Sequence, residues 1–157
     1  MTSDASQELE IRDAYDLLVE TRDRAESGVG GWDALADHFT ADATFIDPAW
    51  GRVEGRESIR RFMLDSMTGL EGWAFPREFT AVDGNHLVSG WQNRLPGQRA
   101  DGSYYQALGI SQLVYAGDGL FRYEQDVLNM VHVFELIRES GWKPGPGAKP
   151  PPRNPLR

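Results

Sequence analysis

Several residue types and patterns are scarce in this sequence, and each shortage excludes a class of protein. None of the 157 residues is a cysteine, so disulfides, thiolate catalysis and cysteine-bound zinc are excluded. The three histidines, His38, His86 and His132, lack the close spacing that is typical of metal ligands, and we expect no metal ion. No run of about 18 apolar residues occurs, so we expect no membrane-spanning helix.

Positive charge is scarce as well. Only 16 lysine and arginine residues stand against 24 aspartate and glutamate residues, which gives a net charge of −8. Nucleic-acid binding depends on clustered basic residues, and we expect none here. The sequence also lacks a phosphate-binding loop, a GxGxxG motif and a GxSxG motif, so no cofactor is expected. The polar, acidic start of the chain lacks the basic and apolar regions of a secretory signal, and a cytoplasmic protein is expected.

The first part of the chain has the apolar period of helices. Ile11, Tyr15 and Leu18 form the stripe of a helix that begins near Asp4 and ends near Glu26. A short helix is predicted over residues 32–39 and a third over 56–67. Between them lies a short strand over 43–47, followed by a loop over 48–55.

The second part changes to the period of strands. We predict strands over 79–82, 86–95, 104–115 and 120–130, separated by hairpin turns such as "DGN" and "GDG". Helices followed by an antiparallel meander favour the α+β class. A helix over 131–140 closes a single domain of residues 1–141. Residues 142–157 are basic and rich in proline, and we expect an extended, disordered tail.

Polar residues on apolar faces are the candidates for function, because a buried polar group without a partner costs about 1–3 kcal/mol. Asp47 follows Phe45 on one face of the predicted strand and precedes Pro48. It is either an exposed strand end or a base whose pKa is raised in an apolar pocket.

Three more polar residues raise the same question. Asn93 shares a mainly apolar strand face, and its amide either bonds neighbouring backbone or points into a cavity. Tyr15 is either a core residue with a satisfied hydroxyl or a hydrogen-bond donor to a ligand. Strict alternation places Asp126 on the exposed face of the last strand, and only a bulge would turn it inward.

The stretch "FTADATFIDPAWGRVEGRESIRRF", residues 39–62, resembles the signature region of the nuclear-transport-factor-2-like superfamily. This group includes ketosteroid isomerases, SnoaL-like polyketide cyclases and limonene-epoxide hydrolases, and the resemblance extends from about Ile11 to Gly141. It implies a strongly bent antiparallel sheet that wraps around the N-terminal helices as a cone with a pocket. It also implies a homodimer through the sheet face.

The resemblance assigns roles residue by residue. Asp47 matches the proton-shuttling base of ketosteroid isomerases, and Tyr15 matches their first oxyanion donor. Ser111 stands where those enzymes have a second donor, a protonated aspartate, so the sequence departs from their pattern. Asp126 matches a catalytic aspartate of the epoxide hydrolases.

Other positions depart from the epoxide-hydrolase pattern or extend the resemblance. Trp91 and Asn93 replace the arginine and aspartate of the epoxide-hydrolase network. Phe45 and Asp47 replace its tyrosine and asparagine. The ending of the domain resembles that of many bacterial members, and Asn129 and His132 are interpreted as residues of the pocket rim.

These observations favour an enzyme that uses acid/base proton transfer on a small apolar carbonyl or polycyclic substrate, as an isomerase, cyclase or dehydratase. Asp47, Tyr15, Asn93 and Asp126 would be catalytic. The substrate would contact Phe45, Trp50, Phe62, Trp91, Ser111, Asn129 and His132. The alternatives are a non-catalytic small-ligand binder, an enzyme that adds water to an epoxide, and an interaction module. Tyr104, Leu108 and Ile110 alternate on one strand face and could form the dimer surface.

Overall fold

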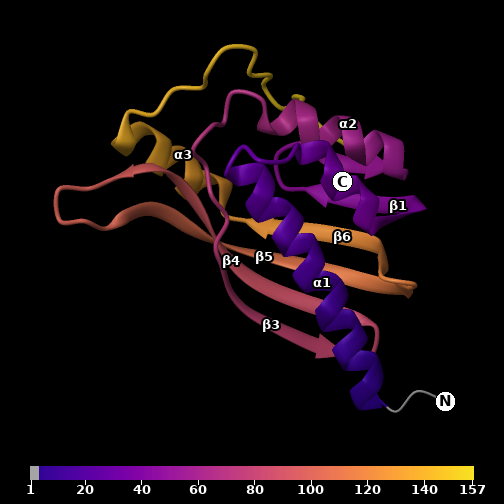
Figure 1. Cartoon of the computed structure of the whole chain (residues 1–157). Coiled ribbons are helices and arrows are strands. Elements are labelled where there is room, and N and C mark those ends of the chain that lie inside the picture. The colour runs from indigo at the N-terminus through magenta and orange to yellow at the C-terminus, as the bar shows by residue number, and fades with distance from the viewer. Residues whose placement is uncertain (1–3) are drawn as a thin grey trace.

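A bent six-stranded sheet forms one side of the molecule, and helices fill its concave side (Figure 1). The computed structural model describes residues 4–157. The spatial order of the strands is β2-β1-β6-β5-β4-β3. Their bounds are β1 Phe39–Asp47, β2 Gly51–Glu54, β3 Arg77–Asp83, β4 His86–Gln98, β5 Tyr104–Gly117 and β6 Leu120–Leu128.

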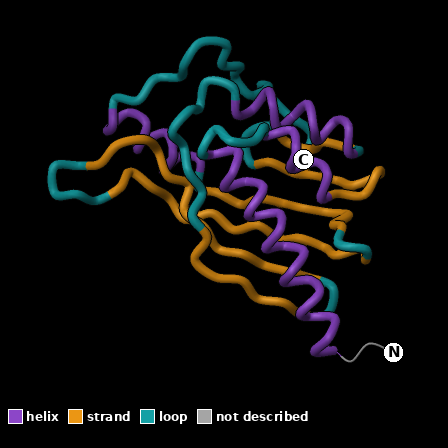
Figure 2. Tube along the Cα trace, in the orientation of Figure 1, coloured by secondary structure: helices purple, strands orange, loops and turns teal. Residues whose placement is uncertain are grey.

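The helices lie where the apolar periodicity predicts them. The long helix α1, Asp4–Glu26, crosses the concave face of the sheet (Figures 1 and 2). The short 3-10 helix η1, Trp32–His38, packs against α2, Arg56–Met67, which covers β1. The last helix α3, Met130–Ser140, packs on β5 and β4. No helix within residues 4–157 combines the length and the apolarity needed to cross a membrane.

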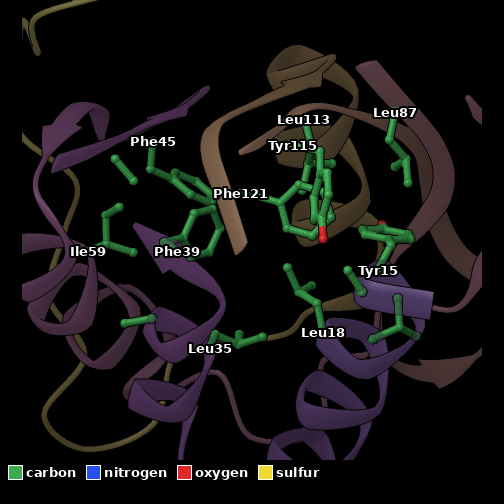
Figure 3. Close-up of a cluster of buried hydrophobic side chains, with 14 of the residues drawn as sticks. Tyr15, Leu18, Leu35, Phe39, Phe45, Ile59, Leu87, Leu113, Tyr115 and Phe121 are labelled. Carbon is green, nitrogen blue, oxygen red and sulfur yellow. The ribbon is translucent and has the colours of Figure 1, made fainter. Parts of the chain in front are cut away.

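The main hydrophobic core fills the space between α1 and the sheet (Figure 3). Tyr15 contacts the edge of the Phe121 ring, with 6.4 Å between the ring centroids, and Tyr115 packs on Phe121 from the other strand. Leu87 and Leu113 are completely buried beside them. The predicted inward face of β4 is confirmed, since its members are all buried: Leu87, Ser89, Trp91, Asn93 and Leu95.

A bulge in β6 decides which of its side chains face the core. Tyr115 of β5 pairs with Phe121, but the preceding Val114 pairs with Tyr123, so Arg122 is an extra residue without an opposite partner. Phe121 is buried before the bulge, and Glu124 is buried after it. Strict alternation would have placed Glu124 and Asp126 outside, and the bulge turns both toward the concave side.

Two features of the sheet differ from the prediction. The segment 48–55, expected to be a loop, contains β2, which pairs with β1 through a tight turn after Asp47. The pair β1–β6 runs parallel, whereas the meander suggested antiparallel pairing throughout. These two strands come from distant parts of the chain, so no hairpin turn dictates their relative direction.

The proline-rich segment 142–157 runs from α3 across the molecule to α2 and the β1–β2 turn (Figure 1). Trp142 packs against Trp73, with ring centroids 5.0 Å apart. The Lys149 ammonium lies 2.6 Å from the Asp65 carboxylate on α2. The Arg157 guanidinium donates to the carbonyl of Pro48 at 2.7 Å. The expected mobility of this segment stays a prediction, and these are the contacts it makes when it lies on the domain.

Candidate functional site

A mostly apolar cavity of about 150 Å³ lies between α1, α2 and the concave face of the sheet. We call it the inner compartment. Its apolar walls come from helices and strands alike, and they include Leu18, Leu35, Phe39, Phe45, Phe62 and Trp91. The predicted contact residues Phe45, Phe62, Trp91 and Ser111 all line it.

A second cavity of about 490 Å³, the outer compartment, lies beneath α3 and the segment 142–157. Trp50 lines only this second cavity. Both compartments share several lining residues, among them Asp47, Asn93 and Phe75. The two spaces therefore meet at a junction where the chain places a carboxyl group and an amide.

Asp47 lies at this junction because β1 ends there and the chain turns at Pro48. Its Oδ1 accepts the backbone N–H groups of Ala49 at 2.8 Å and Trp50 at 2.7 Å. Burial raises the pKa of Asp47 above its ordinary value, and the two N–H groups act in the opposite direction because they favour the carboxylate. The Asp47 side chain is thus partly buried at the junction, and its role as a base stays a prediction.

Asp126 lies in the inner compartment and is held by a short hydrogen-bonded chain. The Trp91 indole Nε1–H donates to the Ser111 hydroxyl oxygen at 2.9 Å, and the Ser111 hydroxyl donates to Asp126 Oδ1 at 2.6 Å. Burial raises the pKa of Asp126 to about 7, and the negative charge of Asp47 acts in the same direction. Ser111 opposes this rise because its hydroxyl stabilises the ionised form.

Glu124 is a residue of the site that the sequence analysis missed. It lines the inner compartment two residues before Asp126, and only 7% of its surface is exposed. Burial raises the pKa of Glu124 well above its ordinary value, and the nearby Asp126 carboxylate raises it further. The two carboxyl groups share a hydrogen bond, which favours the protonated form of Glu124 and the ionised form of Asp126. The Glu-x-Asp spacing on one strand face was the available signal, but without the bulge it pointed outward.

Two nitrogen-bearing side chains complete the polar lining. Asn93 is 4% exposed, and its side chain lines both compartments. Arg22 of α1 lines the inner compartment. It lies on the same helical stripe as Ile11, Tyr15 and Leu18, a position that the sequence analysis passed over.

Three predicted site residues lie outside both compartments. Tyr15 is packed in the core, hydrogen-bonded to Ser89, and burial raises the pKa of its hydroxyl to about 12 (Figure 3). Asn129 is the N-cap of α3, where its side chain accepts the backbone N–H of His132 at 3.2 Å. Both Asn129 and His132 are exposed. Within the described chain, no group of three or more histidine, aspartate or glutamate side chains has an arrangement that could hold a metal ion.

The Ser111 hydroxyl gives a test of this geometry. In Ser111→Ala, the pKa of Asp126 should rise above about 7, because the carboxylate loses the donor that stabilises it. Carbon-13 NMR of the labelled carboxyl group, followed through a pH titration, measures the change. Ser103→Ala, in the exposed β4–β5 loop, should leave the titration unchanged. A lower pKa in Ser111→Ala would contradict the hydrogen-bonded chain.

The fold and the site together define the class of protein: an α+β cone with a carboxyl-lined cavity inside its bend. Two solved structures of this fold hold small molecules. TerC, co-crystallised with polyporic acid, has a TM-score of 0.62 and 18% identity, over 82% of this chain and 98% of the other. A protein of Catenulispora acidiphila DSM 44928 with a ketosteroid isomerase-like fold, in complex with trimethylamine, has a TM-score of 0.60 and 21% identity, over 81% and 97%.

A third structure, a proposed SnoaL-like polyketide cyclase of Jannaschia sp. CCS1, has a TM-score of 0.57 and 20% identity, over 76% of this chain and 90% of the other. Identities of this size show a shared fold. The sequence model of the SnoaL-like domain matches residues 24–123, and the chain therefore belongs to the SnoaL-like family. The resemblance to the nuclear-transport-factor-2-like superfamily is confirmed. No curated protein matches the chain.

Proposed function

We propose that this protein is a cofactor-independent enzyme that transfers protons on a small, largely apolar carbonyl or polycyclic compound, as an isomerase, cyclase or dehydratase. The observation that carries the proposal is the pair Asp47 and Asp126, which face one apolar cavity in different environments. Titratable groups whose surroundings separate their pKa values are suited to opposite roles in acid/base catalysis. Membership of the SnoaL-like family supports a small-molecule isomerase- or cyclase-type role.

The different environments of Asp47 and Asp126 support a different role for each. Asp47, whose carboxylate accepts two backbone N–H groups, is the base that removes a proton next to the carbonyl group. The pKa of Asp126, about 7, leaves it largely protonated in mildly acidic solution, so it is the acid that returns a proton. Asn93 offers its amide N–H to the carbonyl oxygen, where negative charge develops. Glu124 holds Asp126 in place through the hydrogen bond between the two carboxyl groups.

The resemblance gives roles to Tyr15, Asn129 and His132, but these three residues line neither compartment. Tyr15 would have to leave the core to reach a ligand, because it lines neither compartment. A raised pKa also makes its hydroxyl a weaker acid than an ordinary tyrosine. We therefore place Asn93, rather than Tyr15, as the donor to the developing oxyanion.

Proton transfer can be tested before the substrate is known. Cyclic ketones and 1,3-diketones of one to three fused rings are incubated with the protein in D₂O, and proton NMR follows deuterium entering the carbon next to the carbonyl. The protein should accelerate exchange for those ketones that fit the cavity, and Asp47→Asn combined with Asp126→Asn should abolish the acceleration. Ligands that bind tightly without any accelerated exchange would instead indicate a non-catalytic binding protein.

We also propose a homodimer through the convex sheet face. Phe79, Ile110 and Val127 lie in one row across β3, β5 and β6, and the ring of Phe79 covers Gly90 of β4. Phe79, Leu108 and Val127 are exposed apolar side chains on this face. A cytoplasmic location stays a prediction.

Sedimentation at micromolar concentration tests the dimer. The wild-type protein should sediment as a dimer, and Leu108→Lys should sediment as a monomer, because a buried lysine without a partner opposes association. Val29→Lys, at an exposed apolar position after α1, is the matched control and should remain dimeric. A wild-type monomer would contradict the proposal.

A further inference from the structure

We propose that Arg22 is an anion-binding residue, and that the substrate carries an oxyanion, as a carboxylate or an ionised enol or phenol, which enters the inner compartment. This inference rests on the proposed function, because it names the substrate class of the same site. It changes the expected substrate from a merely apolar compound to an apolar compound with one acidic head.

Arg22 is almost enclosed, and two of its three guanidinium nitrogens lack a hydrogen-bond partner among residues 4–157. Its side chain is 11% exposed, and its Nε and Nη2 atoms are buried without a hydrogen-bond partner among residues 4–157. The nearest carboxylate is that of Glu26, whose Oε1 lies 3.9 Å from Arg22 Nε. That oxygen already accepts the backbone N–H of Phe75 at 2.8 Å. A guanidinium stays charged when buried, so unpaired N–H groups of this kind are costly unless a ligand satisfies them.

The groups that face Arg22 leave room for a bound anion. Glu26 lies on the same helix as Arg22, Tyr15 is two stripe positions earlier, and Glu124 and Asp126 face Arg22 from β6. Burial raises the pKa values of Glu124 and Asp126, so these two carboxyls together carry less than two negative charges near neutral pH. Part of the positive charge of Arg22 therefore remains available to a ligand.

The size of the two compartments orients such a ligand. A cavity of about 150 Å³, the volume of the inner compartment, has room for roughly one benzene ring. The outer compartment, at about 490 Å³, is more than three times larger and mainly apolar. The acidic ring would therefore lie inside with Arg22, the reacting carbon would lie at the junction beside Asp47 and Asn93, and the apolar remainder would extend beneath α3.

Bidentate binding matches this chemistry. An arginine presents a planar fork of N–H donors that fits the two oxygens of a carboxylate, or the neighbouring oxygens of an acidic enol. Asn93 would hold a second oxygen of the same molecule at the junction, because its buried amide lines both compartments. The two residues come from α1 and β4, so they would fix the ligand from opposite walls.

The test compares two probes of equal shape and different charge, 2-naphthoate and 2-naphthamide. Isothermal titration calorimetry at about pH 6.5 should show that the wild-type protein binds the carboxylate about 10- to 100-fold more tightly than the amide. Arg22→Gln should lose this preference. Arg24→Gln is the matched control, because it removes the same charge from an exposed position on the same helix and should retain the preference.

Three results would overturn the inference: equal binding of both probes by the wild-type protein, a preference that survives in Arg22→Gln, or a loss of folding in that variant. Thermal unfolding without ligand shows whether Arg22→Gln still folds. Removing an unpartnered guanidinium should leave the melting temperature unchanged or raise it, whereas a large fall would mark Arg22 as a structural counter-ion of Glu26 and Glu124.

Deuterium exchange, and not the binding preference, tests the proposed function. In Asp47→Asn, the preference for naphthoate should persist although deuterium exchange is lost. A protein that prefers naphthoate but never accelerates exchange would keep the anion site and refute the proton-transfer role.

Discussion

Asp47→Asn and Asp126→Asn should each slow deuterium exchange in a bound ketone by about 100- to 10,000-fold, the range typical of removing a positioned general base or acid. Both variants keep the shape of the side chain, and an asparagine oxygen can still accept the hydrogen bonds that Asp47 and Asp126 receive. The loss should therefore appear in the rate of exchange, while the affinity for the ketone changes little. Steady-state NMR exchange rates at several ketone concentrations separate the two quantities.

The pH profile identifies which residue is the acid and which is the base. Exchange should increase as the pH rises through the pKa of Asp47, which burial places above its ordinary value of 3.8. It should decrease as the pH rises through about 7, where Asp126 loses its proton. The alkaline decrease should disappear in Asp126→Asn, because asparagine does not ionise. Glu124→Gln is the control with a neutral isostere, and a loss of exchange as large as in Asp126→Asn would refute these assignments.

The same carboxyl groups should make the protein less stable as the pH rises. The pKa of Asp126 is about 7 in the folded protein and about 3.8 in the unfolded chain, so the folded state binds the proton more tightly between these values. The contribution of Asp126 to the free energy of unfolding is fully present below about pH 3.8, and it is lost as the pH rises through about 7. The loss amounts to at most about 4 kcal/mol in the free energy of unfolding, at about 1.36 kcal/mol for each pKa unit.

Urea unfolding at a series of pH values measures this effect. The wild-type protein should be more stable at pH 5 than at pH 8, and Asp126→Asn should flatten the profile and be the more stable protein at pH 8. The difference belongs to Asp126 and Glu124 jointly, because the two carboxyls titrate as a coupled pair. Asp13→Asn, at an exposed position on α1, should follow the wild-type curve. The opposite result would be a wild-type protein that gains stability over Asp126→Asn between pH 5 and pH 8. It would show that Asp126 is charged and paired in the folded protein.

The sequence predicted the bounds of the helices more accurately than it predicted which residues line the site. The bounds of α1 and α2 agree with their apolar periodicity, and the inward face of β4, with Asn93, follows from strict alternation. Strict alternation placed Asp126 on the exposed face, but one extra residue in β6 turns it inward together with Glu124. The bulge depends on how β6 pairs with β5, so alternation within one strand cannot reveal it.

Arg22 shows a different limit of sequence analysis. A charged residue on an apolar stripe is ordinarily interpreted as the exposed edge of a helix, since long basic side chains can extend toward water. Here the guanidinium lines the inner compartment between α1 and the sheet, and the side chain is only 11% exposed. Its burial depends on the curvature of the whole sheet, which no residue near position 22 encodes.

The end of the chain also bears on how the molecule avoids aggregation. The strand β2 is an edge of the sheet, and unpaired edge strands recruit strands from other molecules. Here the backbone N–H of Arg52 donates to the carbonyl of Leu156 at 2.7 Å, and Pro155 lies so close to Gly51 that a Cβ there would come within 2.4 Å of it. Proline has no N–H to offer a further strand. The segment that covers the outer compartment thus also blocks the edge at which this sheet could otherwise grow into an aggregate.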